Sequence, residues 1–384
     1  MIALKGMSWD HPRGFDPMVA TAKEYSRRNP NVIIEWEKRP LQSFAAQPIE
    51  QMVYDYDLIV IDHPHVGEAV RKNLLFDFDS ATEYQNELNN LSKSSVGLSH
   101  FSYTFIGKQY ALAIDAAAPV SAFRPDYLQL EVIPKSFEEV IKLAETKKVI
   151  WPIKPVDAIS NFNTIAANLG HPINQPNKYF IEKNIGIEIL IMMKKLADQV
   201  PHQCLNMNPI QVLDYMSVND DKIYCPILYG YSNYSRKGFS KHQIKFSNIP
   251  SFDNNLKENC KGSQIGGTGL AISVFSKNIN YAADYAFWVA SGDCQKNLYY
   301  VSGGQPAHID AWKNEKNNID SLSFFNGTLK TLEQAWLRPT YDGYMYFQDV
   351  AGTIINKYLA TGNDINIVID QLTLEFEKSF NVNK

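Results

Sequence analysis

Charged and imidazole side chains follow three apolar runs near the start of the chain. They are His11, Arg13, Arg39, Asp62 and His63. Guanidinium groups match carboxylates or other polar oxygens, and an imidazole beside a carboxylate suits ligand binding, proton transfer or a metal. The first question is which of these chemistries the spacing supports.

The stretch Asp62-His63-Pro64-His65 offers a carboxylate and two imidazoles within four residues. Zinc uses such ligands, but the histidines flank a proline in an expected strand-to-helix turn, and no third ligand is evident. Two interpretations carry more weight: contact with a ligand, or capping of the turn. We expect no metal site and no cofactor.

No catalytic motif stands out in the sequence. A Gly-x-Ser-x-Gly elbow is absent. The cluster Gly266–Gly269 lacks the lysine of a phosphate loop, and a strand-like run follows it rather than a helix. Its glycines allow two segments of backbone to approach closely, and the backbone of Gly267 could contact a ligand there. We do not expect an enzyme; if chemistry occurs, His11 and His63 are the candidate general bases.

Three arginines, Arg13, Arg39 and Arg338, lie beside turn signals and an aromatic residue or a proline. Each is either a structural or solvated arginine or a contact for a ligand. If two or more share one site, an anionic group on the ligand is expected, because guanidinium forks pair with carboxylates.

The elements that would position these residues alternate between strand and helix. The strand-like runs are Leu4–Trp9, Val32–Trp36 and Leu58–Ile61. Asp16 as N-cap and Pro17 at the first helical position predict one helix between them, and a shorter one is expected over Pro48–Tyr54. This order predicts a doubly wound α/β layer. Since ligands bind outside the carboxyl ends of such strands, the polar residues should converge on one edge.

Size and composition indicate a globular protein of two domains. The chain has 384 residues, of which 45% are hydrophobic and 20% charged. A formal net charge of -4 argues against non-specific nucleic-acid binding, and no apolar run is long enough to cross a bilayer. Four widely spaced cysteines without a Cys-x-x-Cys pair leave either one disulfide or four inert thiols; they are Cys204, Cys225, Cys260 and Cys294.

A series of landmarks, taken in order, resembles the type-1 extracellular solute-binding proteins of ABC transporters, the carbohydrate-type periplasmic binding proteins. The landmarks are Leu4–His11, Asp57–Asp62, Cys225–Tyr231, Gly266–Ser273, Ala282–Ala290 and Gly303–Pro306. The resemblance implies two doubly wound α/β lobes, joined by about three hinge crossings, with a ligand cleft between them. Lobe one would comprise residues 1–112 with 265–312, and lobe two residues 113–264 with 313–384.

The resemblance also implies a function in binding. A monomer would trap a small polar solute, a sugar or a sugar acid, by hinge closure and present it to an ABC permease. A periplasmic location is implied if this is a mature chain. No signal peptide is visible before the first strand-like run, so a cytoplasmic chain stays open, as does an enzyme or sensor on the same fold.

The expected ligand contacts combine aromatic faces for a sugar ring with polar groups for its hydroxyls or a carboxylate. They are Trp9, His11, Arg13, Arg39, Asp62, His63, Trp151, Tyr229, Gly267, Trp312 and Arg338.

Overall fold

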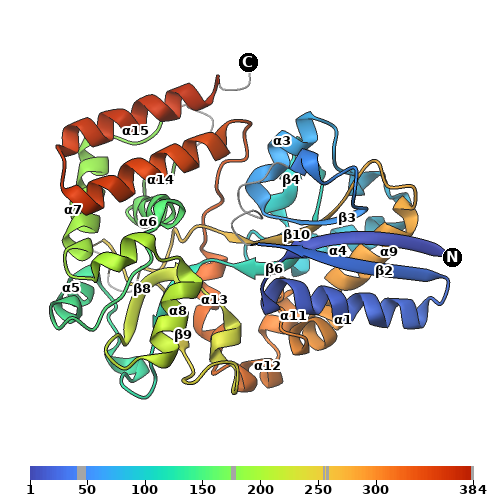
Figure 1. The fold of residues 1–384 in the computed structure, drawn as a ribbon, viewed down its shortest axis with the longest axis horizontal. Helices are drawn as coiled ribbons and strands as arrows, with labels where there is room; N and C mark the ends of the chain where they lie inside the picture. Colours follow the sequence, from blue (N-terminus) through green and yellow to red (C-terminus); the bar gives the residue numbers. More distant parts are fainter. Residues whose placement is uncertain (41–48, 174–178, 254–255, 257–258, 382–384) are drawn as a thin grey trace. The chain divides into compact units, whose positions relative to one another are not determined.

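The chain folds into two compact units, each assembled from two stretches of sequence (Figure 1). Unit 1 comprises Met1–Ala117 and Gly266–Asn318, and unit 2 comprises Ala118–Ile265 and Ile319–Lys384. The computed structural model describes residues 1–384 apart from 41–48, 174–178, 254–255, 257–258 and 382–384. The predicted two-lobed α/β architecture is confirmed. The chain passes between the units after residues 117, 265 and 318, where the sequence-based boundaries are 112, 264 and 312.

Unit 1 is built on a five-stranded sheet of order β2-β1-β3-β10-β6. The strands are β1 (Ile2–Trp9), β2 (Val32–Arg39), β3 (Leu58–Ile61), β6 (Leu112–Ala117) and β10 (Gly266–Ile272). Strand β1 is parallel to β2 and β3, whereas β10 is antiparallel to both β3 and β6. Strands β1, β2, β3 and β6 therefore point the same way, and their carboxyl ends meet at one edge. This confirms the predicted convergence.

Strand β3 lies in the middle of the core of unit 1, and each of its four residues is at most 1% exposed. Helix α1 packs against β1 and β2, and α9 packs against β6 and β10. The remaining regular elements of unit 1 surround this sheet. The helices and short strands are α1 (Pro12–Arg28), α3 (Val66–Arg71), α4 (Gln85–Ser94), β4 (Thr104–Phe105), β5 (Lys108–Gln109), α9 (Ile279–Ala290), α10 (Gly292–Cys294) and α11 (Ile309–Trp312), and the third passage between the units falls within α12 (Glu315–Asp320).

Helix α1 begins earlier than predicted. Its N-cap is His11, whose Nδ1 accepts a hydrogen bond from the Arg13 N–H at 3.0 Å, and Pro12 occupies the first turn. The predicted cap at Asp16 is wrong, because Pro17 lies inside the helix. The helix expected over Pro48–Tyr54 is a 3-10 turn over Ile49–Gln51, and its first expected residue lies outside the described part of the chain.

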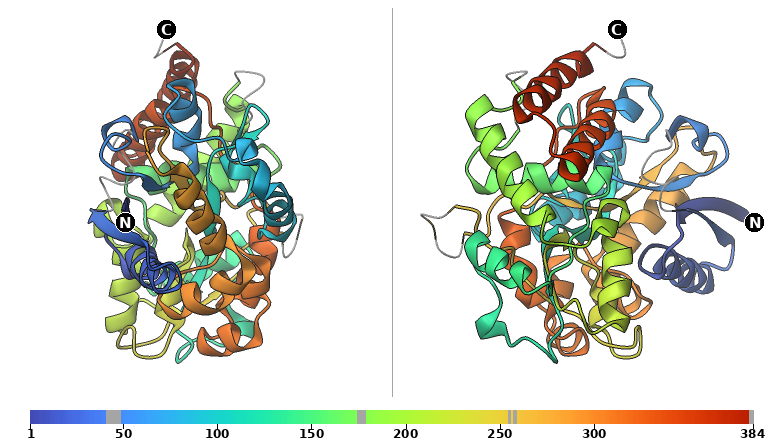
Figure 2. Two further views of the ribbon diagram at one scale, coloured as in Figure 1. Left: turned by 90° about the vertical axis from the view of Figure 1, so that its right-hand side faces the viewer. Right: turned by 60° about the vertical axis from the view of Figure 1, so that its left-hand side comes forward.

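Unit 2 contains a small antiparallel sheet of order β8-β7-β9, covered by helices. A parallel pairing occurs there as an isolated bridge between Val149 and Tyr224. Helix α14 packs closely on α6, since a Cβ on Gly352 would lie 2.3 Å from the carbonyl oxygen of Pro155. Helices α14 and α15 lie side by side in every view (Figure 2). The elements are β7 (Pro119–Phe123), α5 (Phe137–Glu145), α6 (Pro155–Asn168), α7 (Lys183–Ala197), α8 (Pro209–Val218), β8 (Tyr224–Tyr229), β9 (Lys245–Ser247), α13 (Phe324–Glu333), α14 (Tyr344–Thr361) and α15 (Ile365–Ser379).

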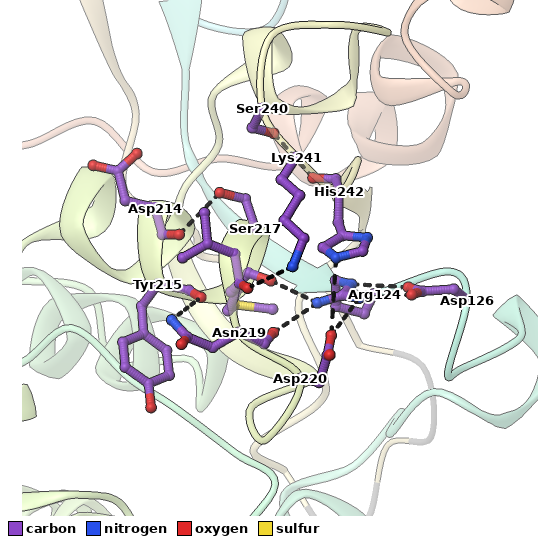
Figure 3. A network of polar contacts seen from close by, with 12 residues as sticks. Arg124, Asp126, Asp214, Tyr215, Ser217, Asn219, Asp220, Ser240, Lys241 and His242 are labelled. Atoms are coloured by element: carbon purple, nitrogen blue, oxygen red, sulfur yellow. Dashed lines mark hydrogen bonds and ion pairs between the residues drawn. The ribbon is translucent and has the colours of Figure 1, made fainter.

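Arg124 anchors the end of β7 to the end of α8 through a network of polar contacts (Figure 3). Its fully buried guanidinium forms a two-pronged pair with Asp126, at 2.8 and 2.6 Å, and reaches Asp220 at 3.0 Å. It also donates to the carbonyls of Met216 and Asn219 at 2.9 and 2.7 Å. A cation is favourable at carbonyls near a helix C-terminus. Because these five bonds use all the donors of the guanidinium, the network is structural.

Candidate functional site

Trp9 and His11 begin the strand-end edge of unit 1. Trp9 ends β1 and pairs in register with Arg39, which ends β2. The rings of Trp9 and His11 stack with their centroids 5.2 Å apart. Burial lowers the pKa of His11 to about 4, with a further contribution from Arg13. The imidazole is therefore neutral at neutral pH, and because Nδ1 accepts a hydrogen bond, Nε2 carries the hydrogen.

Arg13 forms a buried ion pair with Asp115 of β6. Its Nε lies 2.7 Å from Oδ2 and its Nη2 lies 2.6 Å from Oδ1, and both side chains are at most 4% exposed. Burial raises the pKa of Asp115, while the adjacent guanidinium opposes that rise. The structural interpretation of Arg13 thus has a defined partner, and its charge is offset by the Asp115 carboxylate. Sequence reasoning missed Asp115, although a single carboxylate inside the apolar run Leu112–Ala117 signals a buried partner.

Asp62 and His63 lie where β3 ends. The Asp62 carboxylate accepts a hydrogen bond from the His63 N–H at 2.9 Å, so it caps the following 3-10 turn as one of the two interpretations predicted. The imidazole Nδ1 of His63 is 3.3 Å from the same carboxylate, and this ring is fully buried and edge-on to Tyr103. The Asp62 side chain stays 26% exposed, so it is still accessible to a ligand.

Gly267 lies where β10 passes close to β6. Its φ is +105°, and a Cβ there would lie 2.2 Å from the carbonyl oxygen of Asp115. Only glycine fits this position without displacing the backbone. The carbonyl oxygen of Gly267 lies 3.2 Å from the Tyr103 hydroxyl, which donates to it. The close approach predicted from the glycine cluster is confirmed, and it places Gly267 beside Asp115.

Unit 2 contributes Tyr229 and Arg338 to the predicted set. Tyr229 ends β8, is half-buried, and accepts a hydrogen bond from Gln264 Nε2 at 2.8 Å. Arg338 is 6% exposed and its Nη1 donates to Gln348 Oε1 on α14 at 3.1 Å. Gln264 and Gln348 were not foreseen, because a glutamine in sequence carries no signal of burial.

Trp151 and Trp312 differ from the expectation of a stacking surface. Both side chains are 0% exposed, and the Trp312 Nε1–H donates to the carbonyl of Pro306 at 2.6 Å. Neither indole offers an exposed ring face, and we correct their expected role from ligand stacking to packing.

No group of three or more His, Cys, Asp or Glu among the described residues could hold a metal ion. No described helix is both long and apolar enough to cross a membrane. All four cysteines are buried and free.

No protein-family model matches the chain, and no curated protein sequence matches it. Solved structures are similar over almost the full length. Maltose-bound MalE3 of T. maritima has a TM-score of 0.83 at 15% identity, covering 98% of this chain and 99% of that one. An ABC transporter solute-binding protein from Agrobacterium radiobacter K84, in complex with ribitol, has a TM-score of 0.78 at 17% identity and 98% coverage of both chains. One from Thermotoga lettingae TMO, bound with α-D-tagatose, has a TM-score of 0.81 at 14% identity, covering 99% of this chain and 100% of that one. The chain thus has the fold of ABC transporter solute-binding proteins.

Proposed function

We propose that this chain is the substrate-binding component of an ABC transporter and binds a small neutral sugar or polyol. The observation that carries the proposal is the full-length likeness to three structures that hold maltose, ribitol and α-D-tagatose. Fold likeness alone leaves function open, so the residues must support it as well.

In this proposal, each unit supplies groups suited to a sugar-like solute. The strand-end edge of unit 1 supplies His11, Arg39, Asp62 and backbone near Gly267, and unit 2 supplies Tyr229 and Arg338. Trp9 is 3% exposed and supports the ring of His11 from behind. Carboxylate, imidazole, hydroxyl and guanidinium groups together provide the mixed donors and acceptors that sugar hydroxyls need. The three passages of the chain between the units would act as the hinge on which the protein closes.

A neutral solute is favoured over a sugar acid by two carboxylates of unit 1, Asp115 and Asp62. The charge of Arg13 is offset by the carboxylate of Asp115. An anionic ligand would also have to approach the carboxylate of Asp62, which repels it.

Thermal unfolding with added solutes tests the proposal. Maltose, ribitol and α-D-tagatose form the neutral set, and D-glucuronate is the acidic comparison. A solute at a hundred times its Kd stabilises the folded state by about 2.7 kcal/mol. That corresponds to a rise in Tm of about 5–10 °C for units of this size. If no member of a wide set of sugars, polyols and sugar acids raises Tm, the proposal is contradicted. If an added sugar is converted to a new product, an enzyme is favoured instead.

Replacing Asp62 with asparagine is expected to raise the Kd for the bound solute about 10- to 100-fold, because a hydrogen bond to a charged acceptor is lost. Asparagine still caps the turn, so the fold should tolerate the change. Asp77→Asn is the matched control, since Asp77 caps another 3-10 turn of unit 1 by accepting from the Asp79 N–H at 2.9 Å. Calorimetric titration of both variants checks this, and an equal change in Kd for the two would count against a contact at Asp62.

Delivery to a membrane permease and a periplasmic location belong to the same proposal. In proteoliposomes containing the cognate permease and its ATPase, the solute-loaded protein should accelerate ATP hydrolysis.

A further inference from the structure

Gln264 is a buried residue of unit 2, two positions before the strand β10 of unit 1, and is 2% exposed. Its Nε2 donates to Tyr229 Oη at 2.8 Å and to Ser160 Oγ at 3.2 Å. Its Oε1 accepts from Asn163 Nδ2 at 3.1 Å. Both amide hydrogens and the amide oxygen are therefore engaged inside unit 2.

Tyr229 lies beside the first passage of the chain as well. It pairs in register with Pro119, which follows the first passage by two residues. The Ser263 hydroxyl donates to the carbonyl of that same Pro119 at 2.5 Å. The strand that leaves the first passage and the segment that enters the second are thus bonded to each other, and Tyr229 touches both through Pro119 and Gln264.

The segment around Gln264 is clamped by backbone bonds. The Ile265 N–H donates to the carbonyl of Trp336 at 2.7 Å, and the Trp336 N–H donates to the carbonyl of Ser263 at 2.7 Å. Trp336 precedes Arg338 by two residues. Tyr229 is therefore bonded to the segment Ser263–Ile265 that leads into the second passage, and Arg338 lies two residues after the Trp336 that is bonded to it.

We propose that Gln264 is a positioning residue of the solute site: it fixes the hydroxyl of Tyr229 and links a solute contact there to the passages between the units. The inference rests on the proposed function. It adds that a solute bound at Tyr229 is connected through Gln264 to the passages of the chain between the units. Because Tyr229 Oη accepts from Gln264, its own hydrogen points elsewhere and makes it a donor to an acceptor oxygen. A buried and fully satisfied amide holds such a ring in one orientation.

The test is a double-variant cycle on the Kd of the tightest binder among maltose, ribitol, α-D-tagatose and D-glucuronate. Gln264→Met keeps the length of the side chain and removes the amide, and it should raise Kd about tenfold. Tyr229→Phe removes the hydroxyl that accepts this hydrogen bond and keeps the ring. It should raise Kd by a similar factor, and it can be measured even if Gln264→Met folds poorly. The double variant should bind no more weakly than Tyr229→Phe alone, because the two residues act through one contact.

Gln295→Met is the matched control. Gln295 is 0% exposed in unit 1, donates to the carbonyl of Val289 at 3.0 Å and accepts from the Ala307 N–H at 2.8 Å. It should lower Tm and leave Kd unchanged. If Gln264→Met behaves like this control, or if the two site variants multiply in Kd, the inference is overturned. If the wild-type protein binds no sugar, polyol or sugar acid of a wide set, the proposed function is refuted, and measurements on the wild-type protein alone show this.

Discussion

Replacing Asp115 with alanine is expected to lower the free energy of unfolding of unit 1 by about 3–5 kcal/mol. The change removes the carboxylate that binds Arg13 at 2.6 and 2.7 Å, and it leaves the guanidinium buried, with its side chain 4% exposed. Burying a charge without its counter-charge costs far more than the pair itself contributes. Denaturant unfolding followed by tryptophan fluorescence measures the change, with the transition of unit 1 fitted separately if the units unfold in steps.

A surface pair of the same unit provides the control. Lys38 and Asp10 lie 2.7 Å apart and both are about half exposed, so Asp10→Ala should cost at most about 1 kcal/mol. The double variant Arg13→Met, Asp115→Leu removes both charges and should be more stable than Asp115→Ala. If Asp115→Ala is as stable as Asp10→Ala, the account of the buried pair is refuted.

Replacing Asp157 with asparagine is expected to stabilise the protein by about 2–4 kcal/mol at pH 8 and by much less at pH 4. Asp157 is 6% exposed near the start of α6, and among the described residues its Oδ2 has no hydrogen-bond partner. Burial raises its pKa from 3.8 to about 7, with Lys154 opposing the rise. Between these two values the folded chain keeps a proton that the unfolded chain has released, so wild-type stability falls as pH rises from about 4 to 7 and then levels off.

Asparagine is neutral at every pH and should remove this slope. Unfolding curves at pH 4, 6 and 8 for both proteins check the prediction. Asp364→Asn is the control, because Asp364 caps α15 by accepting from the Asn366 N–H at 2.9 Å and asparagine caps equally well. Its effect should stay within about 0.5 kcal/mol. Equal slopes for wild type and Asp157→Asn would show that another group titrates.

The arrangement of the strand-end edge was predictable from sequence, because it follows from rules about parallel strands. The apolar runs, their order and the polar residues after them place His11, Arg39 and Asp62 at one edge, where the structure has them. The first residue of helix α1 was not predictable, since two residues whose side chains can accept a hydrogen bond, His11 and Asp16, are each followed by a proline and only His11 is the cap.

The partners of the site residues were beyond sequence reasoning. Asp115 lies 102 positions from Arg13, and Gln264 lies 35 positions from Tyr229. Such contacts depend on how strands distant in sequence come together, which local patterns do not report. The same limit applies to Trp151, because the sequence around an aromatic residue at a turn is the same whether the side chain stacks on a ligand or packs in a core.

The central place of β10 in the sheet of unit 1 has a consequence for how the chain is made. Strand β10 lies between β3 and β6, yet the ribosome adds it about 150 residues after β6 is complete, a delay on the order of ten seconds. During that interval the facing edges of β3 and β6 have no strand between them, and such edges invite pairing with other chains. A nascent chain of this protein therefore needs protection until Gly266–Ile272 emerges, and any product that stops before it lacks the strand that closes the sheet.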